Sequence, residues 1–263
     1  MLSPEQINDF YETGFIVIRS LFSAAEMAEV SAGFDRLQAQ AASLPADSEN
    51  AMIMHQGSQF VLRAHPDGGR PSIRRVVWVG AAEPVLDHFG EDPRLLAIAR
   101  DLLGTDAGEH LINQAHFKLP HDGISFPWHQ DSQHRGYGTP AWTDVNGRGS
   151  YVQIALAVDP STRENGPLKF IPRSCADGHL ALKYREDDQT NDPRIRAQDA
   201  VDIIAEPGDV AVFGPYTIHG SEPNRSDAPR RVFINGFAAP GANHRNYPGH
   251  EAGAGRTVPF PAT

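Results

Sequence analysis

Residues 208–237, GDVAVFGPYTIHGSEPNRSDAPRRVFINGF, hold the pattern that decides the fold. An apolar run ends near His219, a polar loop follows, and a pair of arginines opens a second apolar run. Similar short runs come earlier in the chain: INQAHFKLP (112–120), YVQIALAVD (151–159), PLKFIP (167–172) and VDIIAEPGDVAVFG (201–214). Several short strands separated by Gly and Pro predict a sandwich or jelly roll rather than alternating βαβ units.

The N-terminal part of the chain has a different character, because its apolar residues recur at helical spacing. SPEQINDFYETG (3–14) predicts a short helix with Ser3 as its cap and Gly14 as its stop, and FIVIRSLF (15–22) predicts a strand. Ser23 precedes a second helical pattern over 24–44, and PRLLAIARDLLG (93–104) predicts a third helix.

From these elements we expect a single domain over residues 1–263 that is mainly β with flanking α-helices. Its parts would be a mostly helical segment over 1–109, a jelly-roll core over 110–240 and a tail over 241–263. The tail is rich in Gly and Pro and is expected to wrap the surface or fray.

Composition restricts the classes of partner. The chain of 263 residues carries 23 Lys+Arg against 33 Asp+Glu, a formal charge of −10, and has no basic run for phosphate backbones. We therefore expect no nucleic acid and no membrane as partner, and a small molecule as substrate. No apolar run approaches membrane-spanning length and the N-terminus does not resemble a secretory signal, so a cytoplasmic location is expected. The sequence carries no signal for the oligomeric state.

The single cysteine, Cys175, excludes an internal disulfide and a Cys-rich zinc site, so a metal would need His and carboxylate ligands. FPWHQDSQHR (126–135) offers such ligands, because in an extended strand His129 and Asp131 point to one face. His219 is the favoured third ligand by its position, and His134 competes with it. Two histidines and one carboxylate leave octahedral positions open, as in non-haem Fe(II) oxygenases. The alternatives are a surface ion pair and a core histidine.

The arginine pair suggests what an open metal position would bind. Arg230 or Arg231 could lie within a small molecule's length of the metal, and an arginine fork pairs bidentately with a carboxylate. A dicarboxylate that chelates the metal at one end and meets the arginine at the other fits this layout. Ser221 could add a hydroxyl to the same carboxylate, or simply cap the turn.

Four segments together resemble the phytanoyl-CoA dioxygenase family of Fe(II)/2-oxoglutarate-dependent oxygenases: FPWHQD, ENGPLKFIPRS, EPGDVAVFGPYTIHGSEPNRS and RRVFINGF. The resemblance implies a double-stranded β-helix of the cupin kind. It implies Fe(II) on His129, Asp131 and His219, with O₂ as the oxidant. Arg230, eleven positions after His219, would hold 2-oxoglutarate alongside Ser221.

Three further predictions concern the surroundings of this site. Gln114, His116 and Lys118 share one face of a strand, which looks either into the barrel or out to water, so Gln114 and Lys118 are candidates for cofactor or substrate contacts. Trp128 either lines the pocket or packs in the core. A segment with Arg135, Tyr137 and Trp142 forms either a substrate lid or an ordinary exposed loop.

Two residues bear on how far the resemblance carries. Cys175 stands where the family commonly has a histidine, which puts the contacts at that rim in doubt. Related halogenases replace the metal carboxylate with a small residue, so the presence of Asp131 disfavours halogenation.

The function that we expect is hydroxylation of an unactivated C–H bond of a small metabolite, with release of succinate and CO₂. Desaturation, cyclisation or epimerisation with the same cofactors is an alternative. A cupin-like metal-binding protein without oxidative chemistry is another, and a zinc hydrolase is a third, although hydrolysis leaves Arg230 unexplained.

Overall fold

The computed structural model describes residues 2–48, 50–64, 69–183, 192–247 and 255–262. Its helices are α1 (Pro4–Thr13), α2 (Ala24–Ala41), α3 (Pro84–Gly90), α4 (Pro93–Leu103) and α5 (Asp131–Arg135), with 3-10 turns η1 (Val79–Ala81), η2 (Ser174–Asp177) and η3 (Ala197–Asp199). Its strands are β1 (Phe15–Ile18), β2 (Ala51–His55), β3 (Ser58–Arg63), β4 (Ser72–Val77), β5 (Ala107–Lys118), β6 (Phe126–His129), β7 (Tyr151–Ala157), β8 (Lys169–Phe170), β9 (Val201–Asp202), β10 (Val210–Phe213), β11 (His219–Ser221), β12 (Arg230–Ala238) and β13 (Arg256–Pro259).

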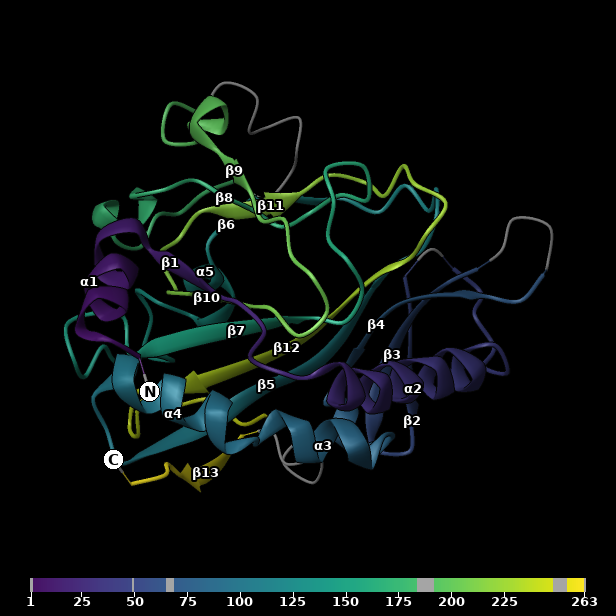
Figure 1. The fold of residues 1–263 in the computed structure, drawn as a ribbon, viewed down its shortest axis with the longest axis horizontal. Helices are drawn as coiled ribbons and strands as arrows, with labels where there is room; N and C mark the ends of the chain where they lie inside the picture. Colours follow the sequence, from purple (N-terminus) through teal and green to yellow (C-terminus); the bar gives the residue numbers. More distant parts are fainter. Residues whose placement is uncertain (1, 49, 65–68, 184–191, 248–254, 263) are drawn as a thin grey trace.

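Two antiparallel sheets face each other, as the prediction of a jelly roll requires. The large sheet runs in the order β1-β10-β7-β12-β5-β4-β3-β2, with β13 also paired to β5, and the small sheet runs β6-β11-β8-β9. Helices α2, α3 and α4 cover one face of the large sheet, and the small sheet lies over its other face (Figure 1). In the run β1-β10-β7-β12-β5 and in β6-β11-β8 the neighbours are distant in sequence, which is typical of a double-stranded β-helix.

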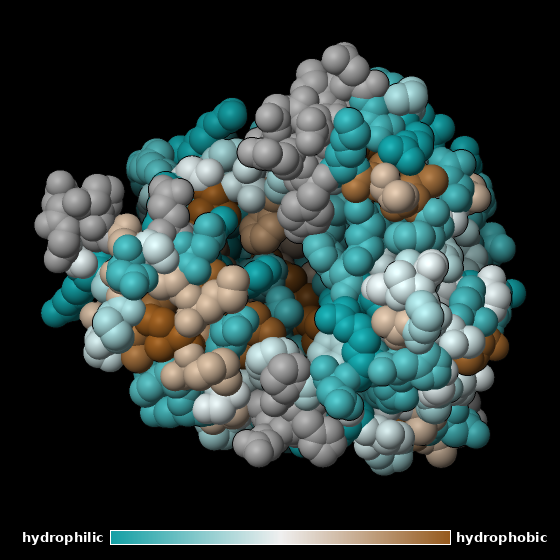
Figure 2. Space-filling view, turned by 180° about the vertical axis from the view of Figure 1, so that it is seen from behind, coloured by the Kyte–Doolittle hydropathy of each residue, from teal (hydrophilic) through white to brown (hydrophobic). Residues whose placement is uncertain are grey.

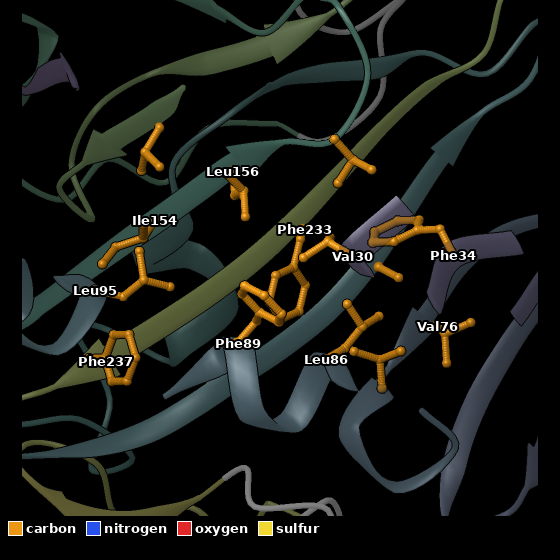
Figure 3. Packing of buried hydrophobic residues seen from close by; sticks show 14 of the residues in the cluster. Val30, Phe34, Val76, Leu86, Phe89, Leu95, Ile154, Leu156, Phe233 and Phe237 are labelled. Atoms are coloured by element: carbon orange, nitrogen blue, oxygen red, sulfur yellow. The ribbon is translucent and has the colours of Figure 1, made fainter. Parts of the chain in front are cut away.

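Strand alternation divides the large sheet into an apolar face and a mixed face. In β7, Val152, Ile154 and Leu156 belong to the core beneath the helices, whereas Gln153 and Ala155 face the small sheet. Figure 3 shows Ile154 and Leu156 beside aromatic side chains of β12 and apolar side chains of α3 and α4. Each fully buried side chain of this kind stabilises the fold by roughly 1.5–3 kcal/mol. This packing holds the opposite, mixed face in place.

The predicted N-terminal helices are confirmed together with their caps. The side chain of Ser3 accepts from the backbone N–H of Gln6, and the side chain of Gln6 accepts from the backbone N–H of Ser3, which together form a capping box. Gly14 ends α1 with φ 95°. Ser23 caps α2 through an equivalent box with Glu26. Serine at the cap with Gln or Glu three residues later is the signal that predicts such a start.

The N-terminal part is less helical than expected, because residues 51–77 form β2, β3 and β4. Gln56 and Gly57 join β2 to β3 as a two-residue turn with φ values of 50° and 78°. Both residues have positive φ, as a tight hairpin of this type needs. These strands extend the large sheet beyond β5 and bring further side chains to its mixed face.

One other expectation needs correction. The strand predicted over 15–22 ends at Ile18. The tail does wrap the fold where it is described, since β13 pairs with β5, and the rest of the tail, 248–254 and 263, lies outside the described residues. Within the described ranges, no helix combines the length and hydropathy that a bilayer crossing requires.

Candidate metal centre

Strand pairing brings together the three residues predicted as metal ligands. His129 is the last residue of β6 and His219 the first of β11, and the two lie opposite each other in the antiparallel register, with ring centroids 4.1 Å apart. Asp131 is the first residue of α5. Ligand atoms of the three side chains lie within 4.8 Å of one another, and all three residues are buried. His134 is outside this cluster.

The local backbone around these residues differs from the prediction in two places. His129 and Asp131 do not share a strand, because the chain leaves β6 after His129 and turns into α5 at Asp131. His219 begins a strand rather than ending one, since β10 ends at Phe213 and a turn separates it from β11. The helical turn at Asp131, rather than strand alternation, returns its carboxylate to the histidines.

Both histidines are held in the tautomer that binds a metal. Nδ1 of His129 donates to the carbonyl of Pro127 at 2.8 Å, and Nδ1 of His219 donates to that of Thr217 at 2.9 Å. Because a carbonyl only accepts, Nδ1 carries the proton and Nε2 the lone pair. Burial lowers the pKa of both rings, that of His219 to about 4 with a further contribution from His129. The rings are therefore neutral near pH 7.

Asp131 supplies negative charge to the same point. Burial opposes ionisation, but His219, Arg135 and His129 prevail and hold the pKa of Asp131 below its usual value. Its Oδ1 lies 3.8 Å from Nε2 of His219, and no described group donates to its buried Oδ2. A buried carboxylate oxygen without a donor calls for a cation. Two imidazole nitrogens and one carboxylate oxygen fit Fe(II).

The cluster opens into a cavity of about 420 Å³ between the two sheets. Gln114, His116 and Lys118 all line it, so the polar face of β5 looks into the barrel and not out to water. Gln114 accepts from Nε2 of His116 at 2.9 Å. The surface seen in Figure 2 is hollowed near its centre, where hydrophobic and hydrophilic residues meet. Cavities of this size hold small ligands.

One end of the cavity brings together two buried cationic side chains. Arg230 lies opposite Lys118 in the β12–β5 register, and Nζ of Lys118 donates to Oγ of Ser221 at 2.7 Å and to the carbonyl of Glu222. Arg230 is 8% exposed, no described carboxylate lies within ion-pair distance, and its Nε has no described acceptor. Burial lowers the pKa of Lys118 to about 6 and that of Arg230 to about 10. An anionic group placed here would relieve both penalties.

The structure separates the two candidate arginines. Arg231 points to the helical face of the sheet, where it donates to Asp159 at 2.8 Å and to Asp35 at 2.6 Å. Only Arg230 of the pair lines the cavity. Neighbouring residues of one strand face opposite ways, so the two roles cannot be exchanged.

Trp128 is not a wall of the cavity and packs against the apolar cluster of Ile171, Leu182 and Ile218. The reason is a register shift between His219 and Ser221, which puts Phe126 and His129 on the cavity side of β6. The Trp128 ring covers Gly220, where an added Cβ would lie 3.3 Å from it. Trp128 therefore lies among apolar side chains and outside the cavity wall, where the prediction had placed it as one of two options.

The segment after the metal motif is not an exposed loop. Tyr137 and Trp142 are buried with stacked rings 4.8 Å apart, and Arg135 is buried in the cavity wall. Cys175 lies in η2, with Sγ 3.9 Å from the carbonyls of Tyr11 and Glu12, so it packs against α1 away from the cavity.

The sequence reasoning missed Gln59 on β3 and Arg75 on β4, which also line the cavity. They were missed because strands β2–β4 were not recognised. The apolar runs AMIM (51–54) and FVL (60–62), with the turn residues Gln56 and Gly57 between them, were the available signals.

A jelly roll with two histidines and a carboxylate in the wall of a cavity, and a buried arginine in the same cavity, defines the class of non-haem iron oxygenases that use 2-oxoglutarate. The comparisons agree. Ectoine dioxygenase from Sphingopyxis alaskensis is 28% identical over 247 residues, covering 87% of this chain and 73% of the relative. Methylphosphonate hydroxylase from Gimesia maris is 27% identical over 239 residues, covering 88% and 78%.

Solved structures of EctD from S. alaskensis share the fold. One holds bound Fe (TM-score 0.68, 25% identity) and another holds 2-oxoglutarate and 5-hydroxyectoine (TM-score 0.67, 26% identity); each covers 90% of this chain, and 77% and 76% of theirs respectively. The model of the phytanoyl-CoA dioxygenase (PhyH) family matches residues 10–232. The chain belongs to this family, and Fe(II) and 2-oxoglutarate are its cofactors.

Proposed function

We propose that this chain is a single-domain dioxygenase that hydroxylates an unactivated C–H bond of a small metabolite and releases succinate and CO₂. The observation that carries the proposal is the shared cavity, which has a His-Asp-His cluster at one point and a buried arginine–lysine pair at another. The acidic composition and the free thiol of Cys175 suit the cytoplasm as its location.

The cofactors would be held by residues already described. His129 and His219 would bind Fe(II) through Nε2, and Asp131 would neutralise part of its charge. Arg230 and Lys118 would hold the far carboxylate of 2-oxoglutarate. Ser221 accepts from Lys118, so its own proton is left to donate to that carboxylate. When bound, iron, 2-oxoglutarate and O₂ together supply the oxidising power for C–H cleavage.

The other residues of the cavity position the reactants and exclude water. Ala155, Ala157, Ala211, Phe213 and Val232 form an apolar wall between the sheets. In such a wall charged ligands are held by fixed donors rather than by solvent, which fixes their orientation. The volume of about 420 Å³ has to hold both the co-substrate and the substrate, and therefore favours a small metabolite. The names of the two relatives, an ectoine dioxygenase and a methylphosphonate hydroxylase, support the same size class.

The experiment is an anaerobic titration of metal-free protein with Fe(II) and 2-oxoglutarate, followed by visible absorbance. A charge-transfer band that needs both additions is expected in the wild type and is lost in His219→Ala. His134→Ala is the matched control, since His134 also lines the cavity but lies outside the cluster, and it should keep the band. No band in a wild-type protein that binds Fe(II), or equal loss in both variants, would overturn the proposal.

A further inference from the structure

The cavity wall holds a second buried arginine, far from the first. Arg135 is 8% exposed and lines the cavity, and its Nε has no acceptor among the described residues. No described carboxylate lies within ion-pair distance of it. Among the described residues its guanidinium contacts Tyr151, through a long hydrogen bond of 3.4 Å to the hydroxyl and over the ring at 5.2 Å from its centroid. Outside the cavity, the buried arginines of the described residues are paired, Arg100 with Asp101 at 2.6 Å and Arg231 with Asp159 at 2.8 Å. A buried guanidinium without a carboxylate is costly unless a ligand completes it.

The short helix α5 explains why Arg135 points into the cavity. Asp131 and Arg135 are four residues apart, so they lie on the same face of the helix, about 6 Å apart along its axis. Because Asp131 faces the histidines, Arg135 is aimed at the space beside them. A group bound by Arg135 would therefore lie within a few bonds of an atom placed next to the metal.

At the same end of the cavity as Arg135 lies a second buried donor without a described partner. Tyr247 lines the wall, and its buried hydroxyl has no described partner. The segment that carries it is tied to α5, because Arg245 donates to the carbonyl of His134 at 2.7 Å. Burial opposes the protonated form of Arg135, but Tyr151, Tyr247 and the carboxylate of Asp131 raise its pKa. Arg135 thus stays a cation with a hydroxyl beside it.

The distance along the sheet separates this place from the end of the cavity that holds Arg230. Tyr151, which contacts Arg135, lies opposite Ala238 on β12, and Gln153 lies opposite Gly236. Gly236 is six residues from Arg230, or roughly 20 Å along the strand. The five-carbon chain of 2-oxoglutarate cannot reach both arginines. Once its far carboxylate is on Arg230, Arg135 remains for another anion.

We propose that Arg135 and the hydroxyl of Tyr247 bind an anionic group of the primary substrate, a carboxylate or a phosphonate, and so orient its nearby carbon toward the metal. The inference rests on the proposed function, because it names the substrate class of the same site. The planar guanidinium of Arg135 offers two parallel N–H donors, and the hydroxyl of Tyr247 offers a third donor. Together they can bind the oxygens of a carboxylate or of a phosphonate. Arg75 adds positive charge to the same cavity.

The test uses the anaerobic protein with Fe(II) and 2-oxoglutarate, in which a substrate near the metal perturbs the charge-transfer band. The probes are carboxylates and phosphonates of one to four carbons, against amides of the same length. At least one anion is expected to saturate the signal while its amide does not. Arg135→Gln should weaken that anion at least 10-fold and Tyr247→Phe about 3- to 10-fold, with 2-oxoglutarate affinity unchanged within 3-fold.

Controls keep the test decisive. Arg135→Lys should restore part of the affinity, and Arg163→Gln, which removes an exposed arginine, should change nothing. A second readout needs no cofactor: the same anion should raise the Tm of metal-free wild type but not of Arg135→Gln. If no charge-transfer band forms in the wild type, the proposed function fails, and this Tm comparison alone decides the subsite.

Three results would overturn the inference. The first is an anion affinity that Arg135→Gln leaves unchanged. The second is amides that bind as well as anions, or no anion of the series binding at all. The third is a loss of 2-oxoglutarate affinity in Arg135→Gln as large as the loss for the probe, which would assign Arg135 to the co-substrate.

Discussion

Replacing Arg230 by glutamine should separate cofactor binding from stability, because its neighbour Arg231 provides a matched control. Arg230 lines the cavity without a described carboxylate partner, whereas Arg231 pairs with Asp159 and Asp35 on the other face of the sheet. The same substitution at adjacent positions of β12 therefore removes a ligand contact in one case and a structural ion pair in the other.

The two magnitudes follow from burial. Truncating one partner of a buried, hydrogen-bonded charge pair costs about 2–4 kcal/mol, so Arg230→Gln should weaken 2-oxoglutarate roughly 30- to 1000-fold. Without ligand, the pKa of Arg230 is lowered by burial to about 10, which corresponds to a desolvation cost on the order of 3 kcal/mol. Ligand-free Arg230→Gln should therefore be as stable as the wild type or more so.

Arg231→Gln should behave in the opposite way. It leaves the side chain of Asp159, which is 13% exposed, without its arginine, and should lower the free energy of unfolding by about 2 kcal/mol. Its affinity for 2-oxoglutarate should stay within 3-fold of the wild type. Calorimetric titration with 2-oxoglutarate and urea unfolding of ligand-free protein measure the two quantities. Loss of affinity in Arg231→Gln but not in Arg230→Gln would refute the assignment.

Three further outcomes are expected. The pKa of Lys118 is lowered to about 6, and a bound anion would restore its charge. Binding of 2-oxoglutarate above pH 6 should therefore take up a proton, and its affinity should fall by up to tenfold per pH unit. In calorimetry, Lys118→Met should bind 2-oxoglutarate more weakly and without this pH dependence. Gly220→Ala puts a Cβ 2.9 Å from the backbone carbonyl oxygen of Phe126. It should lower the free energy of unfolding by about 1–3 kcal/mol and weaken the binding of Fe(II). A thermal stability equal to that of the wild type would contradict this. Fe(II) at 100 times its Kd should stabilise the wild type by about 2.7 kcal/mol, and a similar Tm rise in Asp131→Ala would place the metal elsewhere.

The sequence predicted the parts of the fold that depend on local signals. The helix caps at Ser3 and Ser23 and the alternation over Gln114, His116 and Lys118 each depend on a few neighbouring residues, and the structure agrees with each. The hairpin of β2 and β3 was missed because its turn, Gln56 and Gly57, is not one of the Asn-Gly, Asp-Gly or Gly-Gly pairs that mark such a hairpin most strongly.

Parts of the site depend on tertiary pairing, which no local pattern reveals. His129 and His219 meet only because β6 and β11 pair in one register, and the irregularity in that register turns Trp128 out of the cavity. Arg135 could be connected to Asp131 only once the turn into α5 was known, since the four-residue spacing matters in a helix and not in a strand. Arg230 and Arg231 could be told apart only from the tertiary structure, in which Asp35 of helix α2 pairs with Arg231.

A crystal structure of the protein grown without oxygen, in the presence of Fe(II) and 2-oxoglutarate, would show the proposed centre itself. We expect one metal bound by Nε2 of His129, Nε2 of His219 and the carboxylate of Asp131, with 2-oxoglutarate reaching from the metal to Arg230. Density for the metal on other residues, or for the far carboxylate of 2-oxoglutarate at Arg135 instead of Arg230, would contradict this expectation.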